Sequence, residues 1–319
     1  MNRNLALEFV RVTEMAAIAS ARWMGKGDEK ASDQAAVDAM RSMLDSVDCK
    51  ATIVIGEGER DEAPMLYIGE KVGGGSDNCP ELEIAVDPLE GTTICATGGP
   101  NSISVMAIGE KGGLLHAPDS YMNKIAVGPE AKGCIDITQS ATENIRRLAD
   151  VKKCRPQDLT AVVLDRPRHK DLIAEIRETG CRINLIGDGD VSAAIACALP
   201  DSGIDILLGI GAAPEGVISA AALRCLGGDF QGVFQPRSEE EIERAKGMGI
   251  EDINKVFHMN DLAKGNVMFV ATGVTTGSLL KGVNFKPWGA TTHSLVMRSE
   301  SGTIRHITAE HHFDKKPRY

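Results

Sequence analysis

Aromatic residues and positive charge are scarce in this sequence of 319 residues. Phe, Trp and Tyr make up 4% of the chain, and 35 Lys and Arg stand against 45 Asp and Glu, which gives a net charge of −10. Nucleic-acid binding depends on the neutralisation of phosphates by Lys and Arg, so this balance argues against a nucleic-acid partner. It argues equally against an anionic membrane surface. A phosphorylated substrate would need cations or a local basic pocket to offset the overall field.

Long hydrophobic runs and metal-binding cysteine motifs are also missing. Arg3, Glu8 and Arg11 interrupt the apolar N-terminal stretch, so no signal-peptide core is expected. The uncharged run over 206–214 is shorter than the roughly 20 residues that span a bilayer, so no membrane partner is expected. The eight Cys form no C-x-x-C pair, which predicts reduced, mostly buried thiols in a cytoplasmic protein. The pair His311-His312 is interpreted as a solvated end.

Apolar periodicity predicts helices and strands along the chain. Apolar residues at steps of three and four predict a helix over 4–24, and Ser32 is expected to cap a second helix over about 33–47. The other expected strands are 51–55, 82–86, 102–108, 160–164, 182–186, 204–208, 267–271 and those within 290–308, and the other helices are 169–179, 191–199, 214–226 and 238–249. Alternating strands and helices in the second half predict a largely parallel sheet.

The regular alternation of strands and helices begins after about residue 155, which predicts a division of the chain near that residue. Residues 1–155 would form an N-terminal α+β half with metal-binding loops. Residues 156–319 would form a C-terminal α/β half with substrate-binding loops.

Acidic residues follow two of the short apolar strands. Glu57 comes just after the strand over 51–55, and Asp87 follows the strand over 82–86, with Glu90 three residues later. Carboxylates at the carboxyl ends of strands lie where open α/β sheets build their sites. Oxygen ligands without Cys or His favour Mg²⁺ or Mn²⁺ over zinc. Any one of these acidic residues alone is better explained as a surface turn or cap residue, but the whole loop Asp-Pro-Leu-Glu-Gly-Thr-Thr directly after a buried strand favours a function.

The loop over 87–92 resembles a known signature. It reads Asp-Pro-Leu-Glu-Gly-Thr, and the metal-dependent, lithium-sensitive sugar and inositol phosphatases carry D-P-x-[DE]-G-[ST]. Further segments are similar to the class II fructose-1,6-bisphosphatases, namely 54–70, 165–169, 188–190 and 209–216. These motifs occur in the family's order, and the resemblance covers nearly the whole chain.

The resemblance implies a fold and a metal site. The implied fold is α/β, in the layered α-β-α-β-α sandwich of the fructose-1,6-bisphosphatase and inositol monophosphatase type. The implied cofactor is Mn²⁺ or Mg²⁺, with the ligands Asp33, Glu57, Asp87, Glu90 and Glu215. On sequence alone, Asp33 and Glu215 each lie near a helix start, where a helix-dipole partner is the alternative role.

Two catalytic residues are implied in the same way. Thr92 matches the family's catalytic threonine, whose hydroxyl can orient an attacking water or take part in its deprotonation. The alternative role for Thr92 is a turn or N-cap residue. Asp61, in the acidic loop over 56–62, is a candidate second proton acceptor, with solvated charge as the alternative.

The substrate-binding residues implied by the resemblance form four groups. They are Glu90, Gly91 and Thr92; Tyr121, Arg166, Pro167 and Arg168; Asp188, Gly189 and Asp190; and Ala212. The first group would lie against the phosphate that is removed, and the second would hold the distal phosphate through permanently charged guanidinium groups. The third group would contact sugar hydroxyls, although on sequence alone it is an ordinary loop before a helix. Ala212 stands where some relatives have a Gly that lines the substrate.

The implied activity is metal-dependent hydrolysis of the 1-phosphate of fructose 1,6-bisphosphate to fructose 6-phosphate, in gluconeogenesis or the Calvin cycle. The alternative is a dual fructose-1,6-/sedoheptulose-1,7-bisphosphatase, because 191–195 and 216–222 are especially close to the cyanobacterial subtype with both activities. The resemblance also implies a cytoplasmic homo-oligomer, a tetramer by preference, whose partner is a small sugar bisphosphate.

Two other classes of function remain open from the residues. A nucleotide-dependent oxidoreductase is suggested by Gly209-x-Gly211 after a strand, but Glu215 just beyond would repel a pyrophosphate. A non-catalytic metal-binding module needs only the carboxylates, and it leaves Thr92, Arg166 and Arg168 without a purpose. Phosphate release from sugar phosphates, with NAD(H) absorbance in parallel, distinguishes the three.

Overall fold

The computed structural model describes residues 2–58, 65–75 and 79–315, and the chain forms two compact units. The first contains Met1–Leu114 and Gly265–Tyr319, and the second contains Leu115–Lys264. The division expected from the sequence at residue 155 differs from these units. Residue 155 lies inside the second unit, because β5 (Tyr121–Val127) pairs with β8 (Ile206–Ala212), far along the chain.

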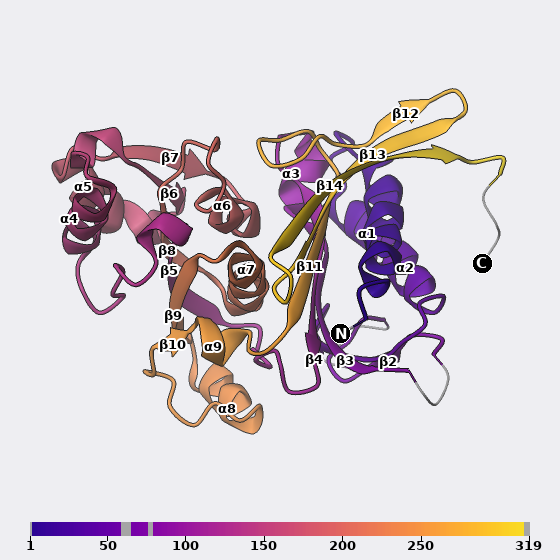
Figure 1. Cartoon of the computed structure of the whole chain (residues 1–319), viewed down its shortest axis with the longest axis horizontal. Helices are drawn as coiled ribbons and strands as arrows, with labels where there is room; N and C mark the ends of the chain where they lie inside the picture. Colours follow the sequence, from indigo (N-terminus) through magenta and orange to yellow (C-terminus); the bar gives the residue numbers. More distant parts are fainter. Residues whose placement is uncertain (1, 59–64, 76–78, 316–319) are drawn as a thin grey trace. The chain divides into compact units, whose positions relative to one another are not determined.

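The first unit is an eight-stranded sheet with helices packed on it. Its strand order is β12-β13-β11-β4-β3-β1-β2, with β14 paired to β13. The strands are β1 (Lys50–Ile55), β2 (Lys71–Val72), β3 (Glu81–Glu90), β4 (Ile103–Glu110), β11 (Val267–Gly273), β12 (Asn284–Lys286), β13 (Gly289–Arg298) and β14 (Thr303–His312). Helices α1 (Leu5–Ala21) and α2 (Glu29–Leu44) lie against the sheet, and α3 (Thr92–Thr97) follows β3 directly (Figure 1).

The N-terminal helix confirms the expectation for residues 4–24. Phe9, Val12 and Ala16 of α1 are completely buried in the core of the first unit. These residues recur every three or four positions, so they form one stripe that packs onto the sheet. Only the ends of the helix differ from the prediction.

The second helix begins earlier than the sequence suggested. Asp28, and not Ser32, is the N-cap of α2, and its carboxylate accepts a hydrogen bond from the backbone N–H of Ala31 at 2.9 Å. The Ser32 hydroxyl instead donates to the Glu29 carbonyl at 2.8 Å, inside the first turn. Both are good capping residues, and the earlier one wins because the chain turns at Gly27, whose φ is 74°.

Asp28→Ala should destabilise the first unit by about 1 kcal/mol, because the first turn of α2 loses its side-chain acceptor. Thermal or urea unfolding measures the change. Asp38→Ala, on an exposed position of the same helix, is the matched control and should change stability much less. Equal effects of the two substitutions would assign no capping role to Asp28.

The second unit is a six-stranded mixed sheet, and the prediction of a largely parallel sheet is wrong for half of it. Its order is β10-β9-β5-β8-β6-β7. The strands not yet introduced are β6 (Thr160–Leu164), β7 (Arg182–Ile186), β9 (Asp229–Gln235) and β10 (Phe257–His258). Strands β7, β6 and β8 run parallel, whereas β5 is antiparallel to both β8 and β9. Strand direction depends on crossover connections that no local pattern encodes.

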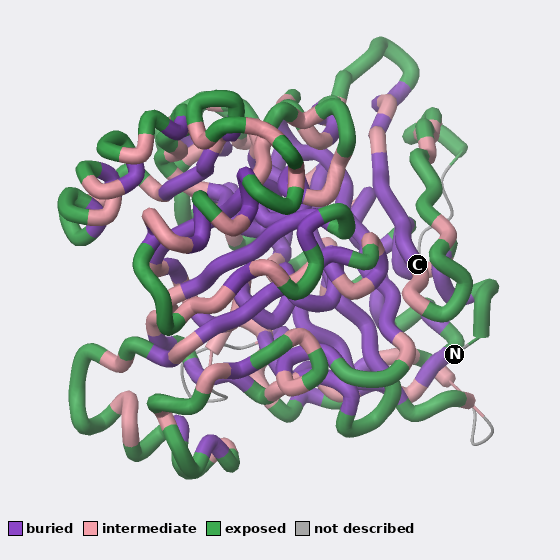
Figure 2. The backbone as a smooth tube through the Cα atoms, turned by 60° about the vertical axis from the view of Figure 1, so that its left-hand side comes forward, coloured by how far each residue is buried: buried purple, intermediate pink, exposed green. Residues whose placement is uncertain are grey.

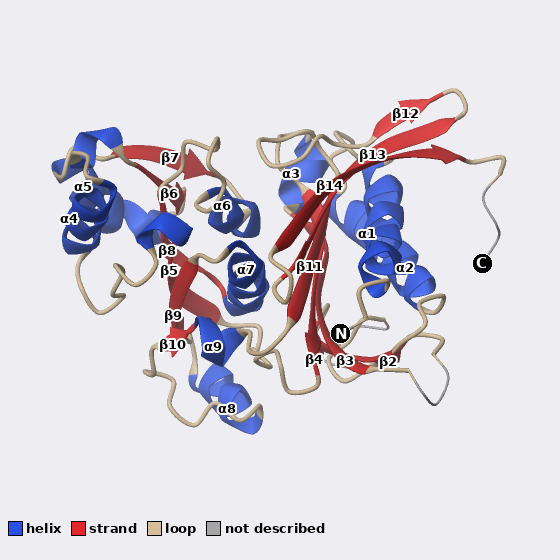
Figure 3. Cartoon of the chain, in the orientation of Figure 1, coloured by secondary structure: helices blue, strands red, loops and turns tan. Residues whose placement is uncertain are grey.

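Helices cover both faces of this second sheet (Figure 3). Its helices are α4 (Ala141–Lys152), α5 (Lys170–Glu178), α6 (Asp190–Ala196), α7 (Ala213–Leu226), α8 (Glu239–Gly247) and α9 (Met259–Leu262). Helices α4 and α5 share a core with the sheet through Ile145, Leu148 and Ile176, all completely buried. Strands β6 and β7 match the predicted bounds, and α5, α6, α7 and α8 match their predictions to within a few residues. Buried stretches alternate with exposed loops along the chain (Figure 2).

Three further expectations concern membrane spans, cysteines and the tail. Among the described residues, no helix is both long enough and apolar enough to cross a bilayer. All eight cysteines are free, and five are buried. His311 and His312 are not a solvated end: they lie in β14, where His311 Nε2 is 2.8 Å from the Thr292 hydroxyl and His312 stacks on Trp288.

Candidate active site

Two strands bring acidic side chains to one edge of the first sheet. β1 and β3 are parallel, and Ile55 pairs with Ala85. Glu57 and Asp87 each lie two residues beyond that pair, at the carboxyl ends of neighbouring strands. The turn after β1 is tight, since a Cβ on Gly56 would lie 1.9 Å from the Leu66 carbonyl oxygen. The expectation that carboxylates gather at this edge is supported by the pairing.

Most of the segment 87–92, which carries the phosphatase-like signature, belongs to strand β3. The strand continues through Asp87 and Glu90, with a register shift against β4 between them. An Asp87 carboxylate oxygen accepts from the Leu89 N–H at 3.2 Å, and the Glu90 carbonyl accepts from the buried Ser102 hydroxyl at 3.0 Å. Bulges of this kind re-aim side chains at the edge of a sheet.

Gly91 and Thr92 complete this loop. Gly91 is the N-cap of α3 with a φ of 82°, a left-handed conformation that favours glycine. Thr92 is the first residue of the helix and is half-buried, while Thr93 beside it is exposed. The turn role considered for Thr92 therefore belongs to Gly91, and the Thr92 hydroxyl remains available for chemistry.

Asp33 lies close enough to Glu57 for their charges to interact. Burial, together with the negative charge of Asp33, raises the pKa of Glu57 to about 7. Burial also raises the pKa of Asp33. A buried carboxylate beside a second negative charge is stabilised in its ionised form when a cation binds there.

The donor set suits a hard divalent cation. Among residues 2–58, 65–75 and 79–315, no three His, Cys, Asp or Glu side chains are close enough together to hold an ion by themselves. The first unit nevertheless presents a carboxylate pair beside the loop of Asp87 and Glu90, with oxygen donors only, as Mg²⁺ and Mn²⁺ prefer. Asp61, the second proposed proton acceptor, lies outside the described residues.

The second unit carries three of the four groups of predicted substrate residues at one edge of its sheet, whereas Glu90, Gly91 and Thr92 belong to the first unit. Arg166, Pro167 and Arg168 follow β6, Asp188 to Asp190 follow β7, and Ala212 ends β8. Tyr121 begins the antiparallel β5 and pairs with Ala212, so it lies at the same edge. The structure therefore brings these three groups of predicted residues to one edge of the second unit.

Two guanidinium groups lie over the ring of Tyr121. The Cζ atoms of Arg168 and Arg237 lie 4.7 and 4.6 Å from the Tyr121 ring centroid. Arg168 donates to the Ile210 carbonyl through Nε at 3.1 Å and Nη2 at 2.8 Å, and Arg237 is paired with Glu241. These contacts restrain a cationic cluster that can bind an anion.

Buried His169 braces the turn that carries the arginines. Its Nδ1 lies 2.7 Å from the Leu164 carbonyl oxygen, and its Nε2 accepts the Ile210 N–H at 2.7 Å. Burial lowers the pKa of His169, consistent with a neutral ring that donates from one nitrogen and accepts at the other. His169 thus ties β6 to β8 directly behind Arg166 and Arg168.

Asp188, Gly189 and Asp190 form the start of α6. Gly189 is the N-cap with a φ of 89°, and its N–H bonds to an Asp188 carboxylate oxygen at 3.1 Å. Asp190 is buried, and Lys124 Nζ lies 2.5 Å from its Oδ2. The ordinary-loop interpretation fits Asp188 and Gly189, but it leaves the buried ion pair of Asp190 unexplained.

Glu215 has a carboxylate oxygen that no described group satisfies. Its Oε2 is buried without a hydrogen-bond partner among the described residues. Burial and the negative charge of Asp190 raise the pKa of Glu215 to about 7, while Lys124 opposes the shift. An interaction with the helix dipole does not explain why a carboxylate oxygen of Glu215 is buried without a hydrogen-bond partner. A bound cation would explain it, because it would satisfy that oxygen.

The glycines that suggested a nucleotide fingerprint lie within strand β8. A Cβ on Gly209 would lie 3.0 Å from His169 Nε2, and one on Gly211 would lie 2.1 Å from Asp190 Oδ2. Both glycines make room for side chains of their own unit, and neither belongs to a strand-to-helix loop that could hold a pyrophosphate.

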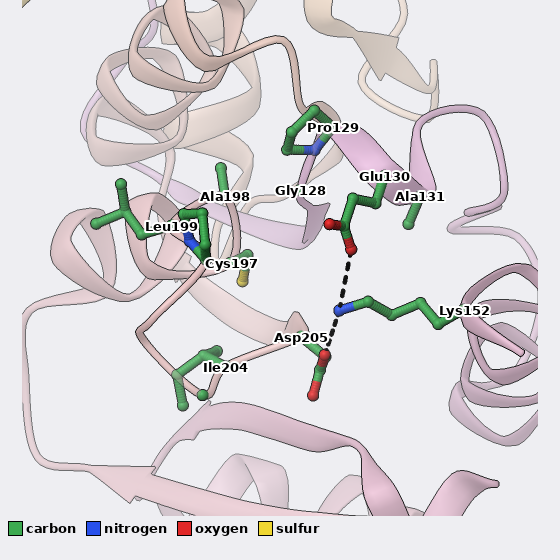
Figure 4. A pocket seen from close by; sticks show the side chains of 12 residues that line it. Gly128, Pro129, Glu130, Ala131, Lys152, Cys197, Ala198, Leu199, Ile204 and Asp205 are labelled. Atoms are coloured by element: carbon green, nitrogen blue, oxygen red, sulfur yellow. Dashed lines mark hydrogen bonds and ion pairs between the residues drawn. The ribbon is translucent and has the colours of Figure 1, made fainter. Parts of the chain in front are cut away.

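A pocket of about 160 Å³ lies at the opposite edge of the second sheet (Figure 4). It is bordered by Pro129, Cys197 and Leu199, and Lys152 extends into it. Lys152 Nζ is 2.5 Å from Asp205 and 3.9 Å from Glu130, so its charge is already neutralised. We assign no catalytic role to this pocket.

Sequence reasoning missed Lys124, His169 and Arg237. The first two had a local signal: Lys124 is a single charge in the apolar strand 121–127, and His169 directly follows the arginine turn. Arg237 had none, because its contact with Tyr121 joins segments more than a hundred residues apart.

Carboxylates at one sheet edge, a threonine beside them and a restrained guanidinium cluster are the groups that phosphate-ester hydrolysis requires. A model of the family described as bacterial fructose-1,6-bisphosphatase, glpX-encoded, matches residues 3–311. The chain belongs to this family.

Several curated relatives share about half of their residues with the chain. One is the D-fructose 1,6-bisphosphatase class 2/sedoheptulose 1,7-bisphosphatase of Thermosynechococcus vestitus, 51% identical over 99% of this chain and 98% of the relative. The protein of that name from Synechococcus elongatus is 51% identical over 98% of each chain. That from Trichodesmium erythraeum is 50% identical over 98% of this chain and 97% of its own.

Proposed function

We propose that this protein hydrolyses the 1-phosphate of fructose 1,6-bisphosphate to give fructose 6-phosphate and phosphate, and that it also accepts sedoheptulose 1,7-bisphosphate. The observation that carries the proposal is the 51% identity, over nearly the full chain, to relatives named for both activities. The carboxylates and the threonine at one edge of the first sheet support it.

Asp33, Glu57, Asp87, Glu90 and Glu215 are the proposed ligands of Mg²⁺ or Mn²⁺. When bound, such a cation neutralises the phosphate oxygens and favours attack by water and departure of the alkoxide. Oxygen-only donors and the buried Oε2 of Glu215 support this assignment.

Thr92 is the proposed catalytic hydroxyl. Its place at the first position of α3, directly after the left-handed Gly91 and two residues after Glu90, supports this role. Glu90 and Gly91 would border the phosphate that leaves. Asp61 remains the proposed second proton acceptor.

Arg166, Pro167, Arg168 and Tyr121 are proposed to bind the phosphate that is not hydrolysed, and Asp188, Gly189, Asp190 and Ala212 the sugar. A clamp for the distal phosphate selects bisphosphates over monophosphates. It does not by itself separate a six-carbon from a seven-carbon sugar, which is consistent with dual activity.

The finer statements about fold, compartment and assembly are proposals as well. We propose the layered α-β-α-β-α sandwich, because each unit is a sheet with helices packed on it. Eight free cysteines support a cytoplasmic location. Exposed Phe285, Trp288 and Ile304 around β12 to β14 support a homo-oligomer, with a tetramer preferred; light scattering after gel filtration measures its mass.

One assay tests the proposed activity. Phosphate release with Mg²⁺ or Mn²⁺ is measured on fructose 1,6-bisphosphate, sedoheptulose 1,7-bisphosphate and inositol 1-phosphate, with NAD(H) absorbance in parallel. We expect turnover of both bisphosphates and no change in absorbance. A preference for inositol 1-phosphate would contradict the distal clamp, and cation binding without any turnover would favour the non-catalytic module.

Arg166→Ala should raise KM for fructose 1,6-bisphosphate by about 10-fold or more, because one charge-assisted contact with the distal phosphate is lost. The ratio of kcat/KM for the bisphosphate to kcat/KM for a monophosphate should fall by the same factor. Arg182→Ala is the control, since Arg182 begins β7 at the opposite edge of the same sheet and is exposed. An unchanged KM in Arg166→Ala would remove Arg166 from the clamp.

A further inference from the structure

Lys124 is a buried charge for which the proposed reaction gives no role. Its side chain is 1% exposed and that of Asp190 is 9% exposed. Nζ donates to Asp190 Oδ2 at 2.5 Å and to the Ala212 carbonyl at 2.9 Å. Removing an ammonium group from water is costly, so a buried lysine is retained only where its partners compensate.

The partners of Lys124 come from two different elements of the proposed sugar subsite. Asp190 is the first residue of α6, and Ala212 is the last residue of β8 and the N-cap of α7. Glu215 lies in the first turn of that helix, and its charge also interacts with Lys124. One ammonium group therefore ties the proposed sugar acceptor to the backbone just before a proposed cation ligand.

The backbone around this pair has no room to spare. A Cβ on Gly211 would lie 2.1 Å from Asp190 Oδ2 and 2.7 Å from Lys124 Nζ, and one on Gly216 would lie 3.4 Å from Lys124 Cδ. Gly211 thus makes room for the ion pair, whereas the nearest atom to a Cβ on Gly216 is Met122 Sδ at 2.9 Å. Lys124 therefore bonds Oδ2 of Asp190, and Gly211 packs against the same oxygen.

We infer that Lys124 is a positioning residue for sugar recognition: it holds Asp190 so that only Oδ1 is presented to a sugar hydroxyl. The inference rests on the proposed function, since it takes Asp190 as a sugar contact. Lys124 itself touches no substrate. Without Lys124, the Asp190 carboxylate would keep its charge but lose its fixed orientation. Sugar binding would then be weaker, because binding would have to restore that orientation.

The test is calorimetric binding of fructose 6-phosphate in EDTA, which needs no cation and no turnover. Lys124→Met should weaken binding by about 10-fold or more, the effect of losing a hydrogen bond to a charged group. Lys124→Arg should restore part of the affinity. In steady-state assays, Lys124→Met should raise KM for fructose 1,6-bisphosphate by a larger factor than it lowers kcat.

Lys152→Met is the matched control. Lys152 and Asp205 form a second pair of the same 2.5 Å length in the same unit, at the edge away from the proposed site. Loss of that pair should reduce thermal stability without changing fructose 6-phosphate affinity. Parallel loss of affinity in Lys124→Met and Lys152→Met would reduce Lys124 to a structural residue.

If Lys124→Met does not fold, the double variant Lys124→Met/Asp190→Asn replaces it, because the Asp190 charge then no longer stays buried without its partner. Its amide can still accept from a hydroxyl, so wild-type affinity in a folded double variant would overturn the inference. Wild-type affinity in Lys124→Met would do the same. Failure of the proposed function is distinguishable, because then the unmodified protein would neither bind fructose 6-phosphate nor hydrolyse the bisphosphate.

Discussion

Asp87→Ala is expected to abolish phosphate release at ordinary Mg²⁺ or Mn²⁺ concentrations while the protein remains folded. Asp87 lies at the carboxyl end of β3, beside the strand that leads to Glu57, so its loss removes a proposed ligand from the sheet edge. Loss of a ligand from an open cation site weakens both cation binding and charge neutralisation of the phosphate. Activity as a function of cation concentration, with circular dichroism for folding, provides the measurement.

The control for this substitution lies on the same strand. Glu81→Ala removes a carboxylate from the opposite end of β3, where Glu81 pairs with Lys111 on the surface. Exposed ion pairs contribute little to stability, so this variant should keep its activity. Exhaustive chelation of the unmodified protein should have the same effect as Asp87→Ala, and full activity in a chelator would disprove the metal site.

Thr92→Ala should lower kcat by about 10²- to 10⁴-fold with a much smaller change in KM, because a positioned hydroxyl helps mainly in the transition state. Thr92→Ser should retain much of the rate, since the hydroxyl remains. Thr93→Ala is the control: the neighbouring hydroxyl is exposed, one residue further into the same helix. A nearly normal kcat in Thr92→Ala would assign Thr92 to the turn alone.

Local elements were predictable where a local pattern decides them. Strands β6 and β7 are short apolar runs between clear helix and turn signals, and both were predicted to the residue. The predicted start of α2 was wrong because Asp28 and Ser32 are both good N-cap residues, and only the turn at Gly27 decides between them. The predicted strand direction in the second sheet was half wrong, since β5 pairs antiparallel with β8, which lies far along the chain.

The proposed site divides in the same way. Asp87, Glu90 and Thr92 could be recognised because they lie close together in sequence where β3 ends and α3 begins, so that sequence spacing and spatial spacing coincide. The stack of Arg168 and Arg237 on Tyr121 could not be recognised, because its members come from three separate elements. The Gly209-x-Gly211 pattern misled for a related reason: its glycines accommodate side chains from distant segments.

The sequence by itself determined the family, the oxygen-rich character of the candidate ligands and the periodicity of most helices, because these depend on residue types at short spacing. Only the tertiary structure decided which carboxylates share an edge of the first sheet and which lysine is buried beside Asp190 in the second unit. Lys124 shows the physical reason. An ammonium group can be buried only where a carboxylate and a carbonyl reach it at 2.5 and 2.9 Å, and those partners lie 66 and 88 residues away along the chain.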